Sequence, residues 1–310
     1  MSPMRDRSLP FVSVIIPVYN DGERLRLCLQ ALKQQTYARY CYEIIVVDNA
    51  SDTSPSVKDI VREFEGAIAL YEDIPGSYAA RNKGLTVAKG EVIAFTDADC
   101  IPATDWIEKG ISHLQQVANC GFVGGEIEVF WRDPKKPSIV EIYESILAFR
   151  QQDCIEKHHY SVTANLFTWR KVIDRVGNFN SRLKSNGDIE WSNRVYAMGY
   201  RQIYAKDVLV KHPALYSFKQ LRKKVVRYAG GAYDRHHQTE YNWLKSNWLL
   251  TKSIAFNLMP PVFFAINNYA DPKLRSISDK LKVILTMTLV RYITVLELLR
   301  LKLGGVSARQ

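Results

Sequence analysis

The chain of 310 residues has few cysteines and none of the cysteine spacings that bind zinc or build a disulfide framework. Its five cysteines are scattered, and no two form a CxxC pair. A disulfide-stapled fold and a zinc centre are therefore disfavoured, and we expect a reducing compartment. Arg5 and Arg7 stand near the N-terminus, but no long apolar run follows them, so we expect no signal peptide.

Long uncharged apolar runs, internal repeats and low-complexity segments are also missing. The most apolar stretch, residues 281–303, is interrupted by Arg291, Glu297 and Arg300. A membrane-spanning helix needs about 20 residues with few charges. The stretch therefore better fits a helix lying on or partly in a membrane interface. A helical hairpin packed on the rest of the chain or on a second subunit is the alternative.

Positive charge is present but unevenly distributed. Residues 1–203 contain 24 Lys and Arg against 26 Asp and Glu, whereas residues 204–310 contain 18 against 6. The last third therefore carries all of the net charge of +10. This asymmetry predicts a polyanionic neighbour, such as anionic lipid, phosphate groups or nucleic acid. The basic segment 219–235 is the part that we expect to meet lipid headgroups, and we find no nucleic-acid-binding motif.

The first half of the chain alternates apolar runs with segments of helical periodicity. Continuous apolar strands separated by helices are typical of a parallel sheet covered on both faces, whose ligands bind beyond the carboxyl ends of the strands. The predicted strands are Val12–Pro17, Glu43–Asp48, Ala67–Tyr71 and Val92–Thr96, and the predicted helices are Glu23–Gln35, Val57–Phe64 and Ala79–Ala88.

The remaining residues are less regular until about residue 217, where the chain becomes basic, apolar and helical. We therefore predict a tail (residues 1–9), an α/β domain (10–216, in halves 10–130 and 131–216) and a C-terminal helical extension (217–310). The elements predicted beyond residue 120 are strands at Phe122–Phe130 and Ser161–Thr168 and helices at Ile139–Gln152, Gly187–Met198, Leu221–Tyr233 and Leu281–Leu303.

Carboxylates follow two of the predicted strands. Asp97 and Asp99 end the fourth strand, where two acids can reach one cation, and such oxygen ligands suit Mg²⁺ or Mn²⁺. The alternative is that they only cap the next turn. Asp48 and Asn49 end the second strand, where an Asx-type turn is the alternative. Arg81 near the start of a helix could bind a diphosphate or be a solvated surface residue.

Two later positions could also take part in chemistry. Asp188 and Glu190 follow a glycine at a predicted helix start, where a carboxylate could act as general base or merely match the helix dipole. His212 stands alone, and a single histidine is more often structural than a ligand.

In this order and spacing, the motifs resemble glycosyltransferase family 2, the inverting enzymes of the GT-A fold. The resemblance covers roughly residues 10–215. It rests on the segments VSVIIPVYN (12–20), EIIVVDNAS (43–51), ARNKG (80–84), FTDAD (95–99), GDIEW (187–191) and HP (212–213). No QxxRW motif follows residue 191, which disfavours a processive polymer synthase.

The resemblance implies a role for each matching residue. Asp188 would be the catalytic base, with Glu190 as the second candidate. Asp99 and His212 would hold Mg²⁺ or Mn²⁺. The nucleotide-sugar would be bound by Pro17, Tyr19, Asn20, Asp48, Asn49, Arg81 and Asp97. Asn49 departs from the two consecutive acids common in such families. We place Trp191 and Asn165 near the acceptor or the donor sugar.

The implied function is transfer of a sugar, with inversion, from a UDP- or GDP-sugar to a hydroxyl of a glycan or lipid-linked acceptor. We expect a metal-dependent hexosyltransferase of cell-surface polysaccharide or glycolipid synthesis, on the cytoplasmic face of the membrane. A non-catalytic nucleotide-binding or membrane-associated scaffold of the same fold is the alternative. Assembly into a homo-oligomer is a further alternative that the sequence leaves open.

Overall fold

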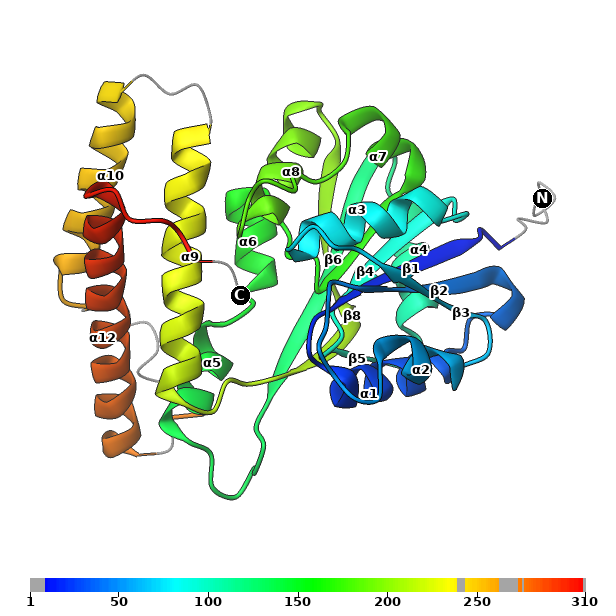
Figure 1. The fold of residues 1–310 in the computed structure, drawn as a ribbon, viewed down its shortest axis with the longest axis horizontal. Coiled ribbons are helices and arrows are strands. Elements are labelled where there is room, and N and C mark those ends of the chain that lie inside the picture. The colour runs from blue at the N-terminus through cyan, green and yellow to red at the C-terminus, as the bar shows by residue number, and fades with distance from the viewer. Residues whose placement is uncertain (1–8, 239–242, 262–272, 275, 309–310) are drawn as a thin grey trace, which may run out of the picture. The chain divides into compact units, whose positions relative to one another are not determined.

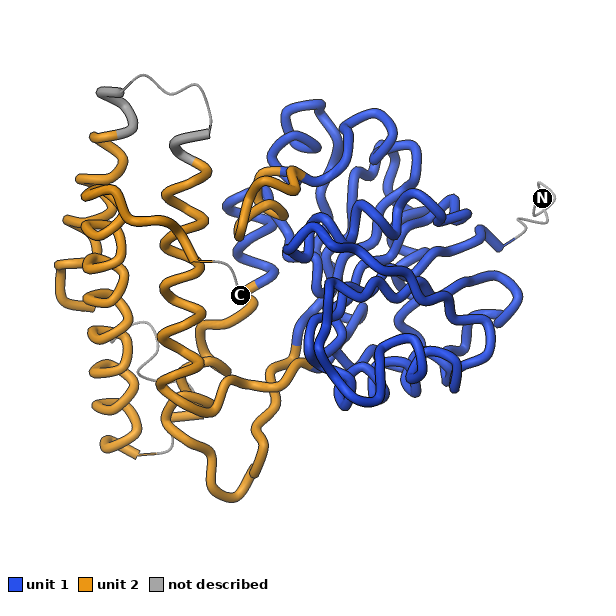
Figure 2. Tube along the Cα trace, viewed as in Figure 1, with its two compact units in different colours: residues 1–127, 151–179, 191–211 blue, residues 128–150, 180–190, 212–310 orange. Residues whose placement is uncertain are grey.

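The computed structural model describes residues 9–238, 243–261, 273–274 and 276–308, which form two compact units (Figure 2). Unit 1 comprises residues 1–127, 151–179 and 191–211, and unit 2 comprises residues 128–150, 180–190 and 212–310. This division differs from the predicted boundary between the α/β domain and the helical extension after residue 216, because residues 128–150 and 180–190 cluster with the C-terminal helices.

The sheet has eight strands in the order β3-β2-β1-β4-β7-β6-β8-β5 (Figure 1). Its first four strands along the chain are the ones predicted from the apolar runs, and they pair in parallel. The strands are β1 (Val12–Val18), β2 (Tyr42–Asp48), β3 (Ala67–Tyr71), β4 (Val92–Thr96), β5 (Ile101–Pro102), β6 (Cys120–Phe130), β7 (Asn165–Trp169) and β8 (Arg201–Pro213).

The second half of the sheet is antiparallel. Strand β7 lies between β4 and β6 and runs against both, and β5 runs against β8. The sheet is therefore mixed. The parallel character that we predicted from continuous apolar strands holds for β1 to β4 and ends at β7.

Helices cover both faces of this sheet (Figure 1). Helix α3 packs directly on β1, where a Cβ added at Gly84 would come within 2.6 Å of the Ile15 side chain. Any larger residue at position 84 would push α3 away from the strand. The helices of unit 1 are α1 (Gly22–Lys33), α2 (Val57–Arg62), α3 (Ser77–Val87), α4 (Trp106–Gln116), α6 (Gln151–His158) and α7 (Arg170–Val176), with a 3₁₀ turn η1 (Arg39–Cys41).

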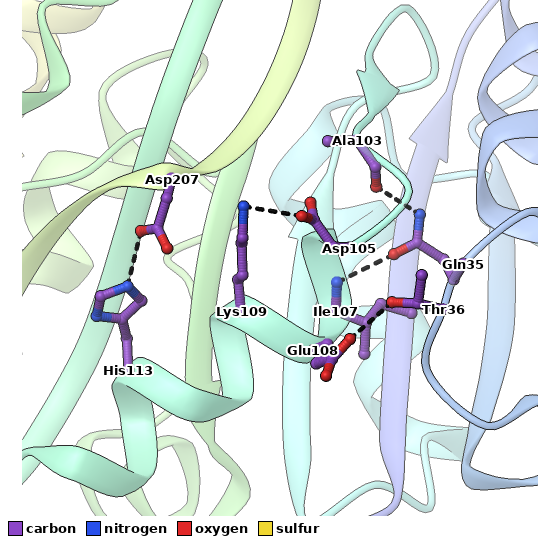
Figure 3. A network of polar contacts seen from close by, with 9 residues as sticks. All are labelled: Gln35, Thr36, Ala103, Asp105, Ile107, Glu108, Lys109, His113 and Asp207. Carbon is purple, nitrogen blue, oxygen red and sulfur yellow. Dashed lines mark hydrogen bonds and ion pairs between the residues drawn. The ribbon is translucent and has the colours of Figure 1, made fainter.

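The chain just beyond β4 is fixed by a polar network around α4 (Figure 3). The Gln35 side-chain amide donates to the Ala103 carbonyl over 2.7 Å and accepts from the Ile107 backbone amide over 3.0 Å. Toward the other end of α4, His113 Nε2 lies 2.7 Å from Asp207 Oδ1. Partial burial acts to raise the pKa of Asp207, but the hydrogen bond and charge of His113 outweigh it, so this pKa lies below its usual value.

Two predicted elements are shorter than expected. The predicted helix 139–152 is broken at Phe149, whose φ is 53°, into α5 (Ile139–Leu147) and α6. The break lets Gln151 turn inward, where its buried amide donates to Ser161 Oγ over 3.0 Å and accepts from the Val162 amide over 3.0 Å. Because residues 161 and 162 are used in this way, β7 starts only at Asn165 instead of at Ser161.

Unit 2 is mainly helical. Its helices are α5, α9 (Phe218–Gln238), α10 (Trp243–Leu258) and α12 (Ile277–Lys302), while α8 (Gly187–Ala197) begins in unit 2 and ends in unit 1. Its core joins α5, α9 and α12 through Tyr143, Leu221, Val225 and Val283. Across the residues that the structure describes, no helix is both long and apolar enough to cross a membrane.

Candidate active site

The carboxyl ends of β1, β2 and β4 lie at one edge of the sheet because the three strands are parallel and adjacent. Val18 pairs with Asp48, and Ile15 pairs with Phe95. The polar residues that follow these strands therefore gather at this edge, as the sequence predicted. Pro17 lies near the end of β1, and the Tyr19 ring just beyond it is 48% exposed.

The loop after β2 is tied to the end of β1 by side-chain hydrogen bonds. The Asn20 backbone amide donates to Ser51 Oγ over 2.9 Å, and Asn20 Oδ1 accepts from the Asp52 amide over 2.7 Å. Asp48 Oδ1 accepts from the Ser51 amide over 2.9 Å. Asp48 thus forms the Asx-type turn that the sequence left as an alternative, and Asn20 ties this turn to the end of β1. Their predicted contact with a nucleotide stays a prediction.

Asn49 holds the segment 72–76 in place. Its Nδ2 donates to the carbonyls of Glu72 (2.9 Å) and Ile74 (2.8 Å), and its Oδ1 accepts from the Gly76 amide (2.6 Å). The side chain is only 7% exposed. An aspartate could not donate to two carbonyls. This requirement gives a structural reason for an asparagine where related families often carry a second acid.

Arg81 and Asp97 form an ion pair at the end of β4. Arg81 is 3% exposed on α3, whereas the Asp97 side chain is 34% exposed. The Arg81 guanidinium also lies 5.7 Å from the centre of the Tyr78 ring. Its Nε is buried and has no hydrogen-bond partner within the described part of the chain. A buried arginine with donor capacity to spare beside a partly open carboxylate suits an anionic or hydroxyl-rich ligand.

Asp99 faces a second arginine, which the sequence reasoning missed. Arg24 on α1 contacts both carboxylate oxygens of Asp21, with Nε 2.8 Å from Oδ1 and Nη2 2.7 Å from Oδ2. Its Nη1 lies 3.5 Å from Asp99 Oδ2. Burial raises the pKa of Asp21, while Arg24 acts to lower it. The spacing of Asp21 and Arg24 at a helix start could have indicated their pairing. Only the fold brings Arg24 to Asp99, which lies far along the chain beyond β4.

Negative charge in this region also affects two thiols. Cys28 on α1 and Cys100 after β4 are both fully buried. Burial raises the pKa of each thiol, and the charges of Asp99 and Asp97 raise it further. Both cysteines therefore stay protonated and serve as core residues.

The donor chemistry at this edge fits a hard divalent cation. Asp99 and Asp97 provide carboxylate oxygens, the ligands that Mg²⁺ and Mn²⁺ prefer. The Arg24 guanidinium balances the charge of the Asp99 carboxylate from a position beside it, where a bound metal cation could do the same. No three His, Cys, Asp or Glu side chains among the described residues gather closely enough to hold a metal ion by themselves. A cation here would therefore also need oxygens from its ligand or from water.

Asp188 and Glu190 lie in the first turn of α8, within unit 2. The turn is set by Asn186, whose φ is 61° and whose carbonyl accepts from the Glu190 amide over 3.1 Å. Ser185, which precedes Asn186, packs on α9, because a Cβ added at Gly231 would come within 2.5 Å of Ser185 Cβ. The two acids therefore lie at a helix start that is packed against α9, and a helix holds a side chain in place more precisely than a loop does.

His212 also belongs to unit 2, and its local structure fixes its tautomer. Nδ1 lies 2.8 Å from the Pro213 carbonyl oxygen. Because a carbonyl can only accept, Nδ1 is the protonated nitrogen, which leaves the lone pair on Nε2. The Phe149 ring packs against the imidazole with centroids 4.5 Å apart. A histidine with this tautomer can act as a metal ligand.

Trp191 and Asn165, which we placed near a sugar, are fully buried in unit 1. Trp191 Nε1 donates to the Gly177 carbonyl over 2.9 Å. Asn165 accepts from Trp106 Nε1 and donates to the carbonyls of Glu126 and Val208, each over 2.8 Å. In this conformation both side chains support the core, and neither has surface that a sugar could touch.

The mixed sheet, with helices on both sides and acidic strand ends, has the architecture of GT-A glycosyltransferases, as predicted. The family model described as glycosyl transferase family 2 matches residues 13–177. Glycosyltransferase AglE of Haloferax volcanii is 39% identical over 229 residues, which are 72% of this chain and 73% of that protein. The chain belongs to glycosyltransferase family 2, and it is a glycosyltransferase.

Solved structures of similar fold agree with this assignment. The mannosyltransferase PcManGT from Pyrobaculum calidifontis, in complex with GDP-Man and Mn²⁺, has a TM-score of 0.64 at 18% identity, covering 94% of this chain and 88% of that one. GalNAc-T7 with UDP, GalNAc and Mn²⁺ has a TM-score of 0.52 at 17% identity, covering 67% and 44%. At these identities the similarity concerns the fold.

Proposed function

We propose that this glycosyltransferase moves a hexosyl group from a UDP- or GDP-sugar to an acceptor hydroxyl with inversion at the anomeric carbon. The observation that carries the proposal is the edge where β1, β2 and β4 end. There the buried Arg81 and the carboxylates of Asp97 and Asp99 occupy the position where α/β sheets bind nucleotides. The GDP-Man bound by PcManGT and the UDP and GalNAc bound by GalNAc-T7 support this donor class.

The donor would be bound mainly by residues of unit 1. The exposed Tyr19 ring, two residues after Pro17, offers a surface for stacking of the base. Asp48 and Asn20 offer acceptors for the N–H groups of the base or the hydroxyls of the ribose. Asn49 would act by shaping the loop beside them. Arg81 would face the diphosphate, and Asp97 would accept hydrogen bonds from ribose or sugar hydroxyls.

Mg²⁺ or Mn²⁺ would be held by Asp99, and His212 is the further ligand that we propose. When bound, the cation would neutralise charge on the diphosphate, which is a poor leaving group while that charge is uncompensated. Arg81 would add a fixed positive charge on the same group, an effect that is strong where water is excluded.

Asp188 would supply the base. Its carboxylate would accept the proton of the acceptor hydroxyl while the hydroxyl oxygen forms a bond to the anomeric carbon. The bond from that carbon to the diphosphate oxygen would break on the opposite face, which inverts the configuration. Glu190, two residues further along α8, is the second candidate for the same task.

Matched variants test this assignment. Removing a general base typically lowers the rate by about 10²–10⁴-fold. We therefore expect Asp188→Asn to bind donor normally and to lose transfer by that factor, with Glu190→Gln tested in parallel. Asp174→Asn, an exposed acid on α7, is the control and should retain activity. Near-normal turnover by Asp188→Asn would refute the assignment, and loss only in Glu190→Gln would transfer the role to Glu190.

The competing proposal is a nucleotide-binding scaffold without catalysis. Calorimetry with UDP and GDP, with and without Mn²⁺, followed by a donor-hydrolysis assay, separates the two. Metal-dependent binding with turnover supports the transferase, whereas binding without turnover of any donor supports the scaffold. The acceptor that we propose is a cell-surface glycan or lipid-linked glycan, assembled at the cytoplasmic face of the membrane.

A further inference from the structure

Helix α12 carries apolar side chains on two faces, of which the described residues of its own unit cover only one. The inner face packs Val283, Val295, Leu298 and Leu301 into unit 2. The outer face, together with the C-cap residue Leu303, carries eight large apolar side chains that are between 44% and 88% exposed. These eight, which we call the α12 stripe, are Ile277, Leu281, Leu285, Leu289, Tyr292, Leu296, Leu299 and Leu303.

The stripe is continuous along the helix. Its members follow one another at intervals of three or four residues from residue 277 to residue 303. Residues at these intervals lie on one face of a helix. Single exposed apolar residues are ordinary, but a contiguous apolar surface of this kind on a helix marks an interaction site.

Basic residues flank the stripe. With about 100° between successive residues of a helix, Lys282 and Arg300 fall along one edge of the stripe and Lys302 along the other. The two acidic residues of α12 lie elsewhere. Glu297 is 6% exposed and pairs with Arg300, and Asp279 lies in the first turn on the side away from the stripe.

We infer that the α12 stripe is a docking surface for an anionic lipid bilayer, in which the helix lies along the membrane interface. An apolar face bordered by Lys and Arg matches the two layers of such an interface, because acyl chains take up the apolar side chains while lipid phosphates meet the cations. A second copy of this chain fits less well, since pairing two stripes would bring basic edges together.

This inference specifies which residues of the segment 281–303, expected from the sequence to lie at a membrane interface, make the contact. The sequence also indicated the basic segment 219–235 as the part that meets lipid headgroups, and α9 does expose Lys219, Arg222 and Lys223. Those cations can add electrostatic attraction, but α9 offers less apolar surface: in its described part Leu221 and Val225 are buried in unit 2, and Phe218 and Tyr228 are 47% and 42% exposed. The continuous apolar face that an interface helix needs is therefore on α12. The inference is independent of the transfer chemistry proposed above.

The test is flotation of the full chain with vesicles of phosphatidylcholine alone or mixed with phosphatidylglycerol. Leu285→Gln/Leu296→Gln changes two stripe residues that are 70% and 67% exposed. We expect it to weaken binding to the mixed vesicles by about tenfold or more, given the free energy of burying two leucines. Lys282→Gln should bind the mixed vesicles about fivefold more weakly than the wild type, and its binding to neutral vesicles should be unchanged.

The matched control is Leu27→Gln/Met198→Gln, which changes two unit 1 residues that are 48% and 47% exposed. It should bind vesicles as the wild type does. All variants should melt at the wild-type temperature, because every substituted side chain is on the surface. Wild-type flotation of Leu285→Gln/Leu296→Gln would overturn the inference.

Sedimentation without lipid tests whether a second copy of this chain, instead of a bilayer, covers the stripe. We expect the wild type and Leu285→Gln/Leu296→Gln to sediment alike. If the wild type self-associates and the double variant does not, and neither binds vesicles, the stripe joins two copies and the membrane inference is overturned.

Discussion

Replacing Asn49 by aspartate should destabilise unit 1 although the two residues have nearly the same shape. The Asn49 amide nitrogen donates to two carbonyls at 2.9 and 2.8 Å, and the side chain is 7% exposed. A carboxylate cannot donate, so both carbonyls would lose their partner and face a negative oxygen. Leaving a buried acceptor unpaired costs about 1–3 kcal/mol. Because both hydrogen bonds are only partly buried, the lower half of that range applies to each, which gives at most about 3 kcal/mol for the pair. In a domain of 150–250 residues this corresponds to a fall in Tm of about 6–12 °C.

The destabilisation should depend on pH. Burial and the two carbonyls disfavour a charged carboxylate at position 49, so the pKa of the introduced aspartate in the folded variant would lie above its unfolded value of about 3.9. The folded state then binds more protons than the unfolded state. The stability of the variant should therefore fall as pH rises above about 4 and level off beyond the raised pKa.

Urea unfolding at two pH values measures both effects. The control is Asn20→Asp, the same chemical change at the neighbouring strand end. Asn20 is exposed and accepts through its oxygen from the Asp52 amide at 2.7 Å, which an aspartate can also do. This variant should stay within about 0.5 kcal/mol of the wild type. If Asn49→Asp keeps the wild-type urea midpoint and loses only nucleotide affinity, Asn49 contacts the ligand and our structural explanation is wrong.

Three further predictions concern charges. Arg24→Gln removes the cation 3.5 Å from Asp99, which competes with a metal ion for that carboxylate. Since exposed ion pairs contribute about 0.5–1 kcal/mol, the affinity for Mn²⁺, measured by EPR titration, should rise about two- to fivefold. Unchanged affinity would contradict metal binding at Asp99. Cys28, whose pKa burial raises, should resist a thiol reagent at pH 8 until urea unfolds the protein. The pKa of Asp207 is depressed, so its pairing with His113 stabilises the fold above about pH 4 and is lost on further acidification. His113→Gln should reduce this acid-induced loss in the free energy of unfolding, by less than about 1 kcal/mol because the pair is exposed.

Most of the parallel half of the sheet could be predicted from the sequence. Strands β1 to β4 are short apolar runs, and the intervening helices show their own periodicity. These signals are local, so they survive in the sequence. The motifs at the strand ends were equally clear, because parallel neighbouring strands bring their carboxyl ends to one edge without further information.

The antiparallel half and the helix break depended on distant contacts. Asn165 looked available for a sugar, yet it joins α4, β6 and β8 through three hydrogen bonds. The break at Phe149 serves Gln151, whose partners lie up to 26 positions away. No local pattern marks a residue whose role is to satisfy a carbonyl on another strand. The division into two units likewise assigns residues 128–150 to the C-terminal helices.

The sequence by itself determined the family, the strand-end motifs and the excess of positive charge in the last third. The tertiary structure decided which charges meet, as with Arg24 beside Asp99, and which apolar residues stay uncovered, as along the α12 stripe. The physical reason is that a motif or a period belongs to consecutive residues. Exposure and ion pairing instead depend on what the rest of the chain packs against them.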